Sequence, residues 1–343
     1  MFGPSLIWLG LVWGCGEEPR DTTVRTVLTP EEIAEKTVRT RDDWSVPKTT
    51  ILPLVDDTHP VIVEAEVLFQ QGQHVEAAER LLKLIESEPE LVTAHSFLSA
   101  VLIQLGDLQQ AIVAAETVME LAPSAWSYCN LGTVYILDEQ FEQAKGAFEQ
   151  ALRIDPKYFL AFRNLGSIAY QEKRYADAEM YFQRFIRIDP EDTYAYVAYG
   201  QVLAEQGKLE TAKEVYLYRL QELEWDAESH RRTPSGLTLD LPLALAEVYR
   251  RQGQTEEAMR WFLQTLSWSW VYQGHWASEA SYADKAYQRM VTMLQSLPHQ
   301  QRVTYKQQWQ GWFMEEKQQI PVLERDSEEA KFVQWLQLVE DGP

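Results

Sequence analysis

Apolar side chains recur along most of the chain at the spacing of amphipathic helices, and the helices they predict come in pairs. Within each pair, apolar residues at i, i+3, i+4 and i+7 form one face. An alanine recurs once per pair at intervals of 34, 33, 34 and 34 residues, and a proline follows the second helix at intervals of 34, 33 and 34. The alanines are Ala77, Ala111, Ala144, Ala178 and Ala212, and the prolines are Pro89, Pro123, Pro156 and Pro190. This period predicts a stack of helix–turn–helix units, each of which buries its apolar face only against its neighbours.

One position in the first helix of each pair is small. Gly132, Gly166 and Gly200 occupy it at intervals of 34 residues, while Ala65 and Ser99 stand there in the first two copies. A small residue lets two helices approach closely, and proline, which has no N–H group, ends the second helix. The third copy has the fullest pattern: Tyr128, Leu131, Gly132, Tyr135, Ala144, Phe148, Ala151 and Pro156.

This pattern resembles the tetratricopeptide repeat, a helix–turn–helix unit of 34 residues. Six copies are expected over residues 58–266, with extra residues near 222–236 delaying the sixth copy. The resemblance implies an all-α fold, a right-handed superhelix whose first helices line a concave groove.

The period is lost in residues 267–343, but helical spacing continues there. Three further helices are expected, one around Ala280–Leu294, one around Val303–Phe313 and one around Phe332–Val339. Repeat arrays need atypical ends, so these helices are interpreted as a cap. The alternative is a separate binding domain.

The first fourteen residues have the features of a signal peptide. Their apolar run, Leu6 to Trp13, is far shorter than the ~20 residues that span a bilayer, and a small residue and a cysteine follow it. The tetrad Val12-Trp13-Gly14-Cys15 resembles the lipobox of bacterial lipoproteins, which implies lipidation of Cys15. No Lys or Arg precedes the run, and Trp13 is bulky for its position. The alternative is an apolar leader before a soluble domain. Residues 15–57 are expected to be a mostly extended tether with a short helix over Pro30–Val38.

Charge and composition narrow the range of functions. With 31 basic and 52 acidic residues, the net charge is -21, which disfavours binding to nucleic acid. The sequence contains no recognisable catalytic motif, no metal-ligand spacing and no phosphate loop. We therefore expect a non-enzymatic chain without a cofactor or a metal.

The concave groove implied by the resemblance is the candidate binding site. Among the 24 groove positions of the second to fifth repeats, only Arg163 and Glu205 are charged. Asn130 and Asn164 resemble the asparagine ladder of O-linked N-acetylglucosamine transferase, whose side-chain amides bond to an extended peptide. The residues expected to contact a partner are Phe97, Trp126, Asn130, Arg163, Asn164, Ser167, Tyr170, Tyr194 and Gln201.

These features predict a scaffold in the bacterial envelope, lipid-anchored at Cys15 and facing the periplasm from the outer membrane. A protein or peptide segment would occupy its groove. The alternative is a soluble cytoplasmic interaction module without an anchor. A third possibility, a small-molecule or glycan binder using the Trp-rich C-terminal region, has no motif behind it.

Overall fold

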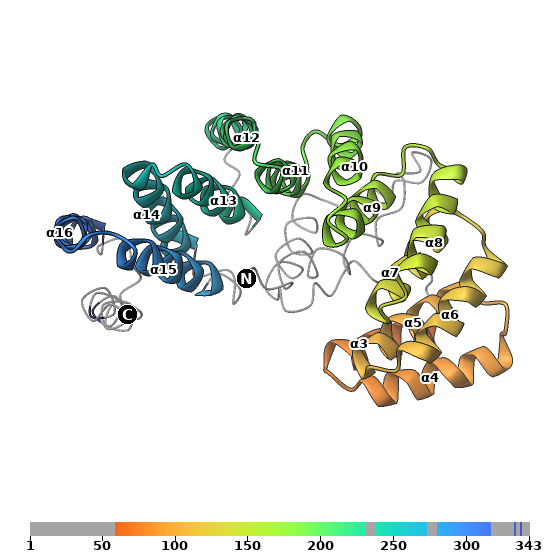
Figure 1. The fold of residues 1–343 in the computed structure, drawn as a ribbon. Helices are drawn as coiled ribbons and strands as arrows, with labels where there is room; N and C mark the ends of the chain where they lie inside the picture. The colour runs from red at the N-terminus through yellow and green to blue at the C-terminus, as the bar shows by residue number, and fades with distance from the viewer. Residues whose placement is uncertain (1–58, 231–236, 273–279, 317–332, 334–336, 338–343) are drawn as a thin grey trace. The chain divides into compact units, whose positions relative to one another are not determined.

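The computed structural model describes residues 59–230, 237–272 and 280–316, together with Val333 and Gln337 (Figure 1). Within these residues the chain forms α-helices joined by short turns, and the all-α expectation is confirmed. The expected signal peptide, the tether and the helix over Pro30–Val38 lie outside the described residues. So does the last expected C-terminal helix, apart from Val333 and Gln337. None of the described helices is long and apolar enough to cross a membrane.

The described residues fall into two compact units, one ending at Glu191 and the other beginning at Asp192. The first unit consists of four helix pairs, each packed against the next (Figure 1). Its helices are α3 (Pro60–Gln70), α4 (His74–Ser87), α5 (Val92–Leu105), α6 (Leu108–Leu121), α7 (Ala125–Leu137), α8 (Phe141–Ile154), α9 (Phe159–Gln171) and α10 (Tyr175–Ile188). These bounds match the first four predicted repeats.

In the third and fourth repeats the small position lies beneath an aromatic ring. A Cβ atom added to Gly132 would lie 2.8 Å from Phe148, and one added to Gly166 would lie 2.9 Å from Phe182. Phe148 and Phe182 are buried. Glycine is needed here because the ring of the second helix rests on the backbone of the first.

The turn inside each pair uses a left-handed residue at a fixed place. Gly72 and Gly106 both have φ +78°. Glu139 and Lys173 occupy the same place in the third and fourth repeats, with φ 58° and 60°. This conformation is strained for residues with a side chain, so the turn geometry is kept even where the glycine is not.

Polar side chains link one repeat to the next near these turns. The Gln109 amide donates to a carboxylate oxygen of Asp138 at 2.8 Å, and Lys145 bonds to Glu172 at 3.1 Å. Each bond joins the second helix of one repeat to the turn region of the following repeat. The bonds therefore favour the register in which neighbouring pairs stack.

The second unit continues with helix pairs and then departs from the repeat. Its helices are α11 (Thr193–Glu205), α12 (Leu209–His230), α13 (Leu237–Arg251), α14 (Thr255–Tyr272), α15 (Ala280–Gln295) and α16 (His299–Glu316). The extra residues expected near 222–236 are largely absorbed by α12, which is 22 residues long where α10 has 14. Pro242 lies inside α13. The core of this unit gathers Phe262, Tyr287, Trp309 and Phe313, all buried.

Candidate functional site

The predicted groove residues of the first unit lie on α5, α7 and α9, the first helices of three successive pairs. Phe97 is buried, and its ring centroid lies 5.7 Å from that of Phe69 on α3. Trp126 is also buried, in one cluster with Cys129 and Leu160. These apolar side chains form the packed layer of this face.

Two of the predicted polar residues are fully buried as well. The Nδ2 atom of Asn164 lies 3.7 Å from the sulfur of Cys129, one repeat earlier. The hydroxyl of Ser167 donates to the carbonyl oxygen of Arg163 at 3.0 Å. Asn164 thus links α9 to α7.

Asn130, Arg163 and Tyr170 are half-buried. The ring centroid of Tyr170 lies 5.8 Å from that of Tyr175, across the turn between α9 and α10. That contact orients the large amphipathic side chain of Tyr170. Aromatic residues and arginine are the types that most often dominate binding interfaces.

The remaining two predicted residues, Tyr194 and Gln201, lie on α11 of the second unit, and both are half-buried. Nearby on α11, Glu205 bonds to Arg251 of α13 at 2.7 Å. Arg250 binds both carboxylate oxygens of Glu247, at 2.6 and 2.8 Å. The first helices of the second unit, α11 and α13, therefore carry ion pairs in addition to the ring of Tyr194 and the amide of Gln201.

Charged groups of α15 extend this ionic character, and the sequence reasoning missed them. Burial lowers the pKa of Lys285, against an opposing effect of Asp240. Burial also lowers the pKa of Arg289, against the attraction of Glu247. No signal in the sequence identified them, because the repeat period that locates a groove position is lost after residue 266.

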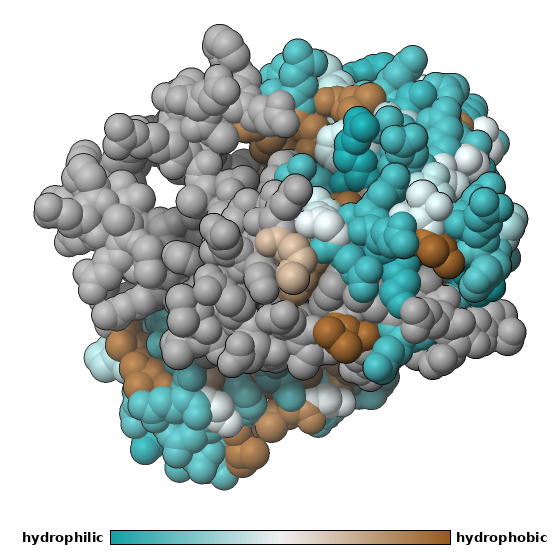
Figure 2. Space-filling model, turned by 90° about the vertical axis from the view of Figure 1, so that its left-hand side faces the viewer, coloured by the Kyte–Doolittle hydropathy of each residue, from teal (hydrophilic) through white to brown (hydrophobic). Residues whose placement is uncertain are grey.

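The exposed surface is mostly polar where Figure 2 displays it, with apolar residues in separate patches. Within the described residues, no three His, Cys, Asp or Glu side chains lie close enough together to hold a metal ion. The features with the character of a binding site are the faces of the first helices and one polar depression of the second unit, described below.

Helix pairs stacked in this way, with a packed apolar layer shared between neighbouring pairs, define a class of repeat scaffold for protein interaction. Models of the tetratricopeptide repeat match residues 59–83, 90–157, 129–193, 181–214 and 241–268. The chain therefore carries tetratricopeptide repeats, as the spacing of its alanines, glycines and prolines predicts.

Solved structures with a TM-score of 0.50 show the same fold. A tetratricopeptide repeat protein from Parabacteroides merdae is 17% identical with a TM-score of 0.50, and the match covers 71% of this chain and 95% of that one. PilW, described as a widely conserved type IV pilus biogenesis factor, is 18% identical with a TM-score of 0.50, covering 60% and 90%. PilF of Pseudomonas aeruginosa is 18% identical with a TM-score of 0.42, covering 62% and 95%. No curated protein sequence matches the chain.

Proposed function

We propose that the chain is a lipid-anchored scaffold of the bacterial envelope that binds a protein segment on the α5–α7–α9 face of its first unit. Its role would be to assemble or position an envelope complex, such as a pilus or secretin or the peptidoglycan machinery. PilW, which shares the fold, is a pilus biogenesis factor. The identity between the two chains is too low for that likeness to support more than the fold.

One observation carries the binding proposal: the near absence of charge on this face. In the second to fourth repeats Arg163 is the only charged residue at the groove positions, although the chain has a net charge of -21. The half-buried side chains of Asn130, Arg163 and Tyr170 on this face suit an extended segment with few charges. Asn130 would bond to the backbone of this segment, and Arg163 would bind an acidic side chain or a terminal carboxylate.

Site-specific photocrosslinking tests this part. A photoreactive residue at Tyr170 is expected to capture a defined partner in cells, and the substitution Arg163→Glu is expected to abolish the adduct. The matched control is the same photoreactive residue at Met180, which is exposed on the second helix of that repeat, α10. Equal capture of the same protein from both positions would contradict the proposed face.

The anchor proposal rests on the sequence alone, namely the short apolar run that ends in Gly14-Cys15. Expression in a Gram-negative host with a labelled fatty acid should give labelled, membrane-associated protein. Cys15→Ala should remove the label, whereas Cys129→Ala should keep it because Cys129 is buried in the repeat core. Absence of label in all three proteins, with the chain in the cytoplasmic fraction, would favour the soluble module instead.

A further inference from the structure

A polar depression of about 990 Å³ lies in the second unit, between the start of α14 and the first half of α16. Ligand sites in proteins commonly have volumes of roughly 300–1,000 Å³. Four of the lining side chains are glutamines, two are threonines, two are glutamates and one is a tyrosine, and the remaining lining residues are Gly253 and Pro298. The depression differs in both place and chemistry from the face proposed above for a protein partner.

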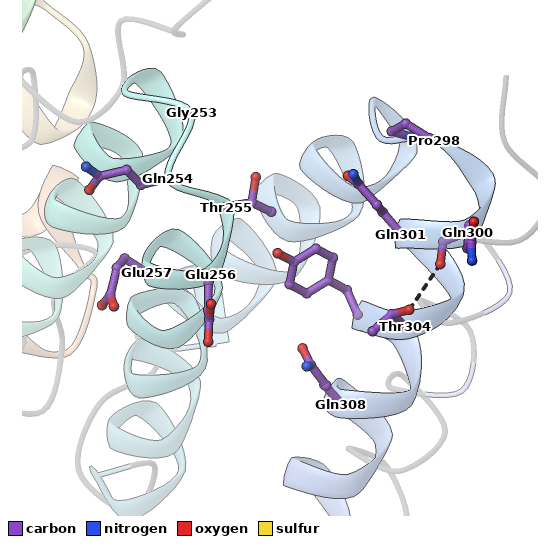
Figure 3. A pocket seen from close by; sticks show the side chains of 11 residues that line it. Gly253, Gln254, Thr255, Glu256, Glu257, Pro298, Gln300, Gln301, Thr304 and Gln308 are labelled. Atoms are coloured by element: carbon purple, nitrogen blue, oxygen red, sulfur yellow. Dashed lines mark hydrogen bonds between the residues drawn. The ribbon is translucent and has the colours of Figure 1, made fainter.

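Two helices supply its walls (Figure 3). Thr255 and Glu256 stand in the first turn of α14, and Gln301, Thr304 and Gln308 stand on α16. The Thr304 hydroxyl donates to the carbonyl oxygen of Gln300 at 3.1 Å, which leaves its oxygen able to accept. Each glutamine amide offers both donors and an acceptor. The walls thus present donors and acceptors at intervals along a full side of the depression.

This lining selects against several kinds of ligand. None of the lining residues is a lysine or an arginine, so a phosphate or another strongly anionic group would lack a counter-charge. Glu256 and Glu257 would also repel it. No aliphatic side chain other than Pro298 lines the walls. An apolar peptide would therefore displace water from the polar side chains of the walls without replacing their hydrogen bonds.

A neutral sugar chain is neither anionic nor apolar, and it suits this lining. Its hydroxyl groups both donate and accept, as the glutamine and threonine side chains do. Tyr305 also lines the depression, and its partly buried side chain packs against the core of the second unit. An aromatic ring fixed in this way offers an apolar surface to the C–H face of a pyranose, and its hydroxyl offers a polar end.

We propose that this depression is a binding site for a neutral oligosaccharide. The glutamines of α16 and Thr304 bond to sugar hydroxyl groups, and Tyr305 stacks on a ring. On the opposite wall, Glu256 accepts hydrogen bonds from sugar hydroxyl groups and repels acidic sugars. The site gives the second unit a ligand of its own, independent of the protein partner proposed for the first.

Isothermal titration of the full chain with triacetylchitotriose, cellotriose and maltotriose tests the site, with trigalacturonic acid as the anionic comparison. Saturable binding of at least one neutral trisaccharide is expected, with weakening of roughly tenfold or more in Gln301→Leu/Gln308→Leu and in Tyr305→Leu. The matched control is Gln307→Leu, on the same helix but outside the lining, which should bind like the wild type. Circular dichroism checks that each variant folds.

Three results would overturn the proposal. They are no saturable binding of any neutral trisaccharide up to about 10 mM, equal binding by the double variant and the wild type, and preferred binding of the acidic trisaccharide. Arg163→Glu should leave sugar binding intact. Failure of the sugar site is therefore distinguishable from failure of the protein-binding face.

Discussion

At the scale of single residues, the size of the residue at the small position is related to the size of the residue that packs on it. Sixteen residues separate Gly132 from Phe148 and Gly166 from Phe182, and the same interval leads from Gly200 to Tyr216. A Cβ atom on Gly200 would lie 2.2 Å from the Tyr216 ring. Where the small position is instead Ala65 or Ser99, the residue sixteen places later is smaller. These residues are Leu81 and Ala115, respectively. The sixth repeat has Ala246 with Phe262, and nothing in the structure explains that exception.

The substitution Gly166→Ala should therefore destabilise the protein by about 1–3 kcal/mol, because the added methyl group overpacks the contact with Phe182. Phe182→Leu alone should also destabilise, by leaving a cavity. The double variant should recover part of the loss, since it recreates the alanine–leucine pairing of the first repeat. Urea unfolding of the four proteins measures this coupling. Strictly additive free energies would show that the ring does not rest on Gly166.

The turn residues lead to the opposite prediction, that a substitution to glycine stabilises the protein. Lys173 is exposed and holds φ at 60°, a conformation that glycine adopts without strain. Lys173→Gly should stabilise the protein by about 0.5–1 kcal/mol, after allowance for the greater freedom of glycine in the unfolded chain. Ala176→Gly is the matched control, because Ala176 is exposed within helix α10 and should lose about 1 kcal/mol. Gly106 obeys the same rule. Because its φ is +78°, Gly106→Ala should destabilise the protein more than its position near a turn would suggest.

At the scale of helices, the sequence predicted the elements whose ends carry local chemical signals. Helix α7 begins at a capping box in which Ser124 accepts from the Ser127 backbone and the Ser127 side chain accepts from the Ser124 backbone. Helices α6, α8 and α10 end within two residues of a proline. Helix α12 was predicted less well because Glu224 replaces that proline and allows the helix to continue to His230.

Contacts between helices of neighbouring repeats were not predictable from the period, and Tyr135 shows why. Its hydroxyl donates to Glu116 of the preceding repeat at 2.7 Å, but both positions vary from one copy to the next. Burial, with help from this bond, raises the pKa of Tyr135 to about 12. The bond joins α7 to α6 and stabilises the protonated phenol.

Tyr135→Phe should lower stability by about 0.5–1.5 kcal/mol at neutral pH. A raised pKa in the folded state means that this contribution is complete below the unfolded value of roughly 10. It is lost as the pH rises toward 12. The difference between wild type and variant should therefore shrink above pH ~10, which urea melts between pH 8 and about 11 can measure. Tyr218→Phe serves as the control on an exposed tyrosine, and a difference that grew with pH would contradict the assignment.

At the scale of the whole chain, the repeat period predicts which helix pairs are neighbours, but it does not predict where the chain divides into compact units. The loss of the repeat places a sequence boundary at residue 267, whereas the contacts divide the described residues between Glu191 and Asp192. The repeat consensus runs through that second boundary unchanged, with Pro190 before it and Gly200 after it. Of the two candidate sites, the repeat period predicts only one. The repeat register located the α5–α7–α9 face. The polar depression depends on the placement of α16 relative to α14, which the period does not describe.

A fragment of residues 59–191 should fold by itself, because its hydrophobic clusters are built from its own helices. Since stability in such arrays is mainly a sum of nearest-neighbour terms, Gly166→Ala should destabilise the fragment by about as much as it destabilises the full chain, within roughly 0.5 kcal/mol. Circular dichroism should show a helical fragment with a cooperative urea transition. The fragment spanning residues 92–230, which cuts across the boundary at Asp192, is the comparison and should be less stable despite its similar length. A fragment 59–191 that stays unfolded while 92–230 folds would contradict the prediction that the first unit is stable by itself.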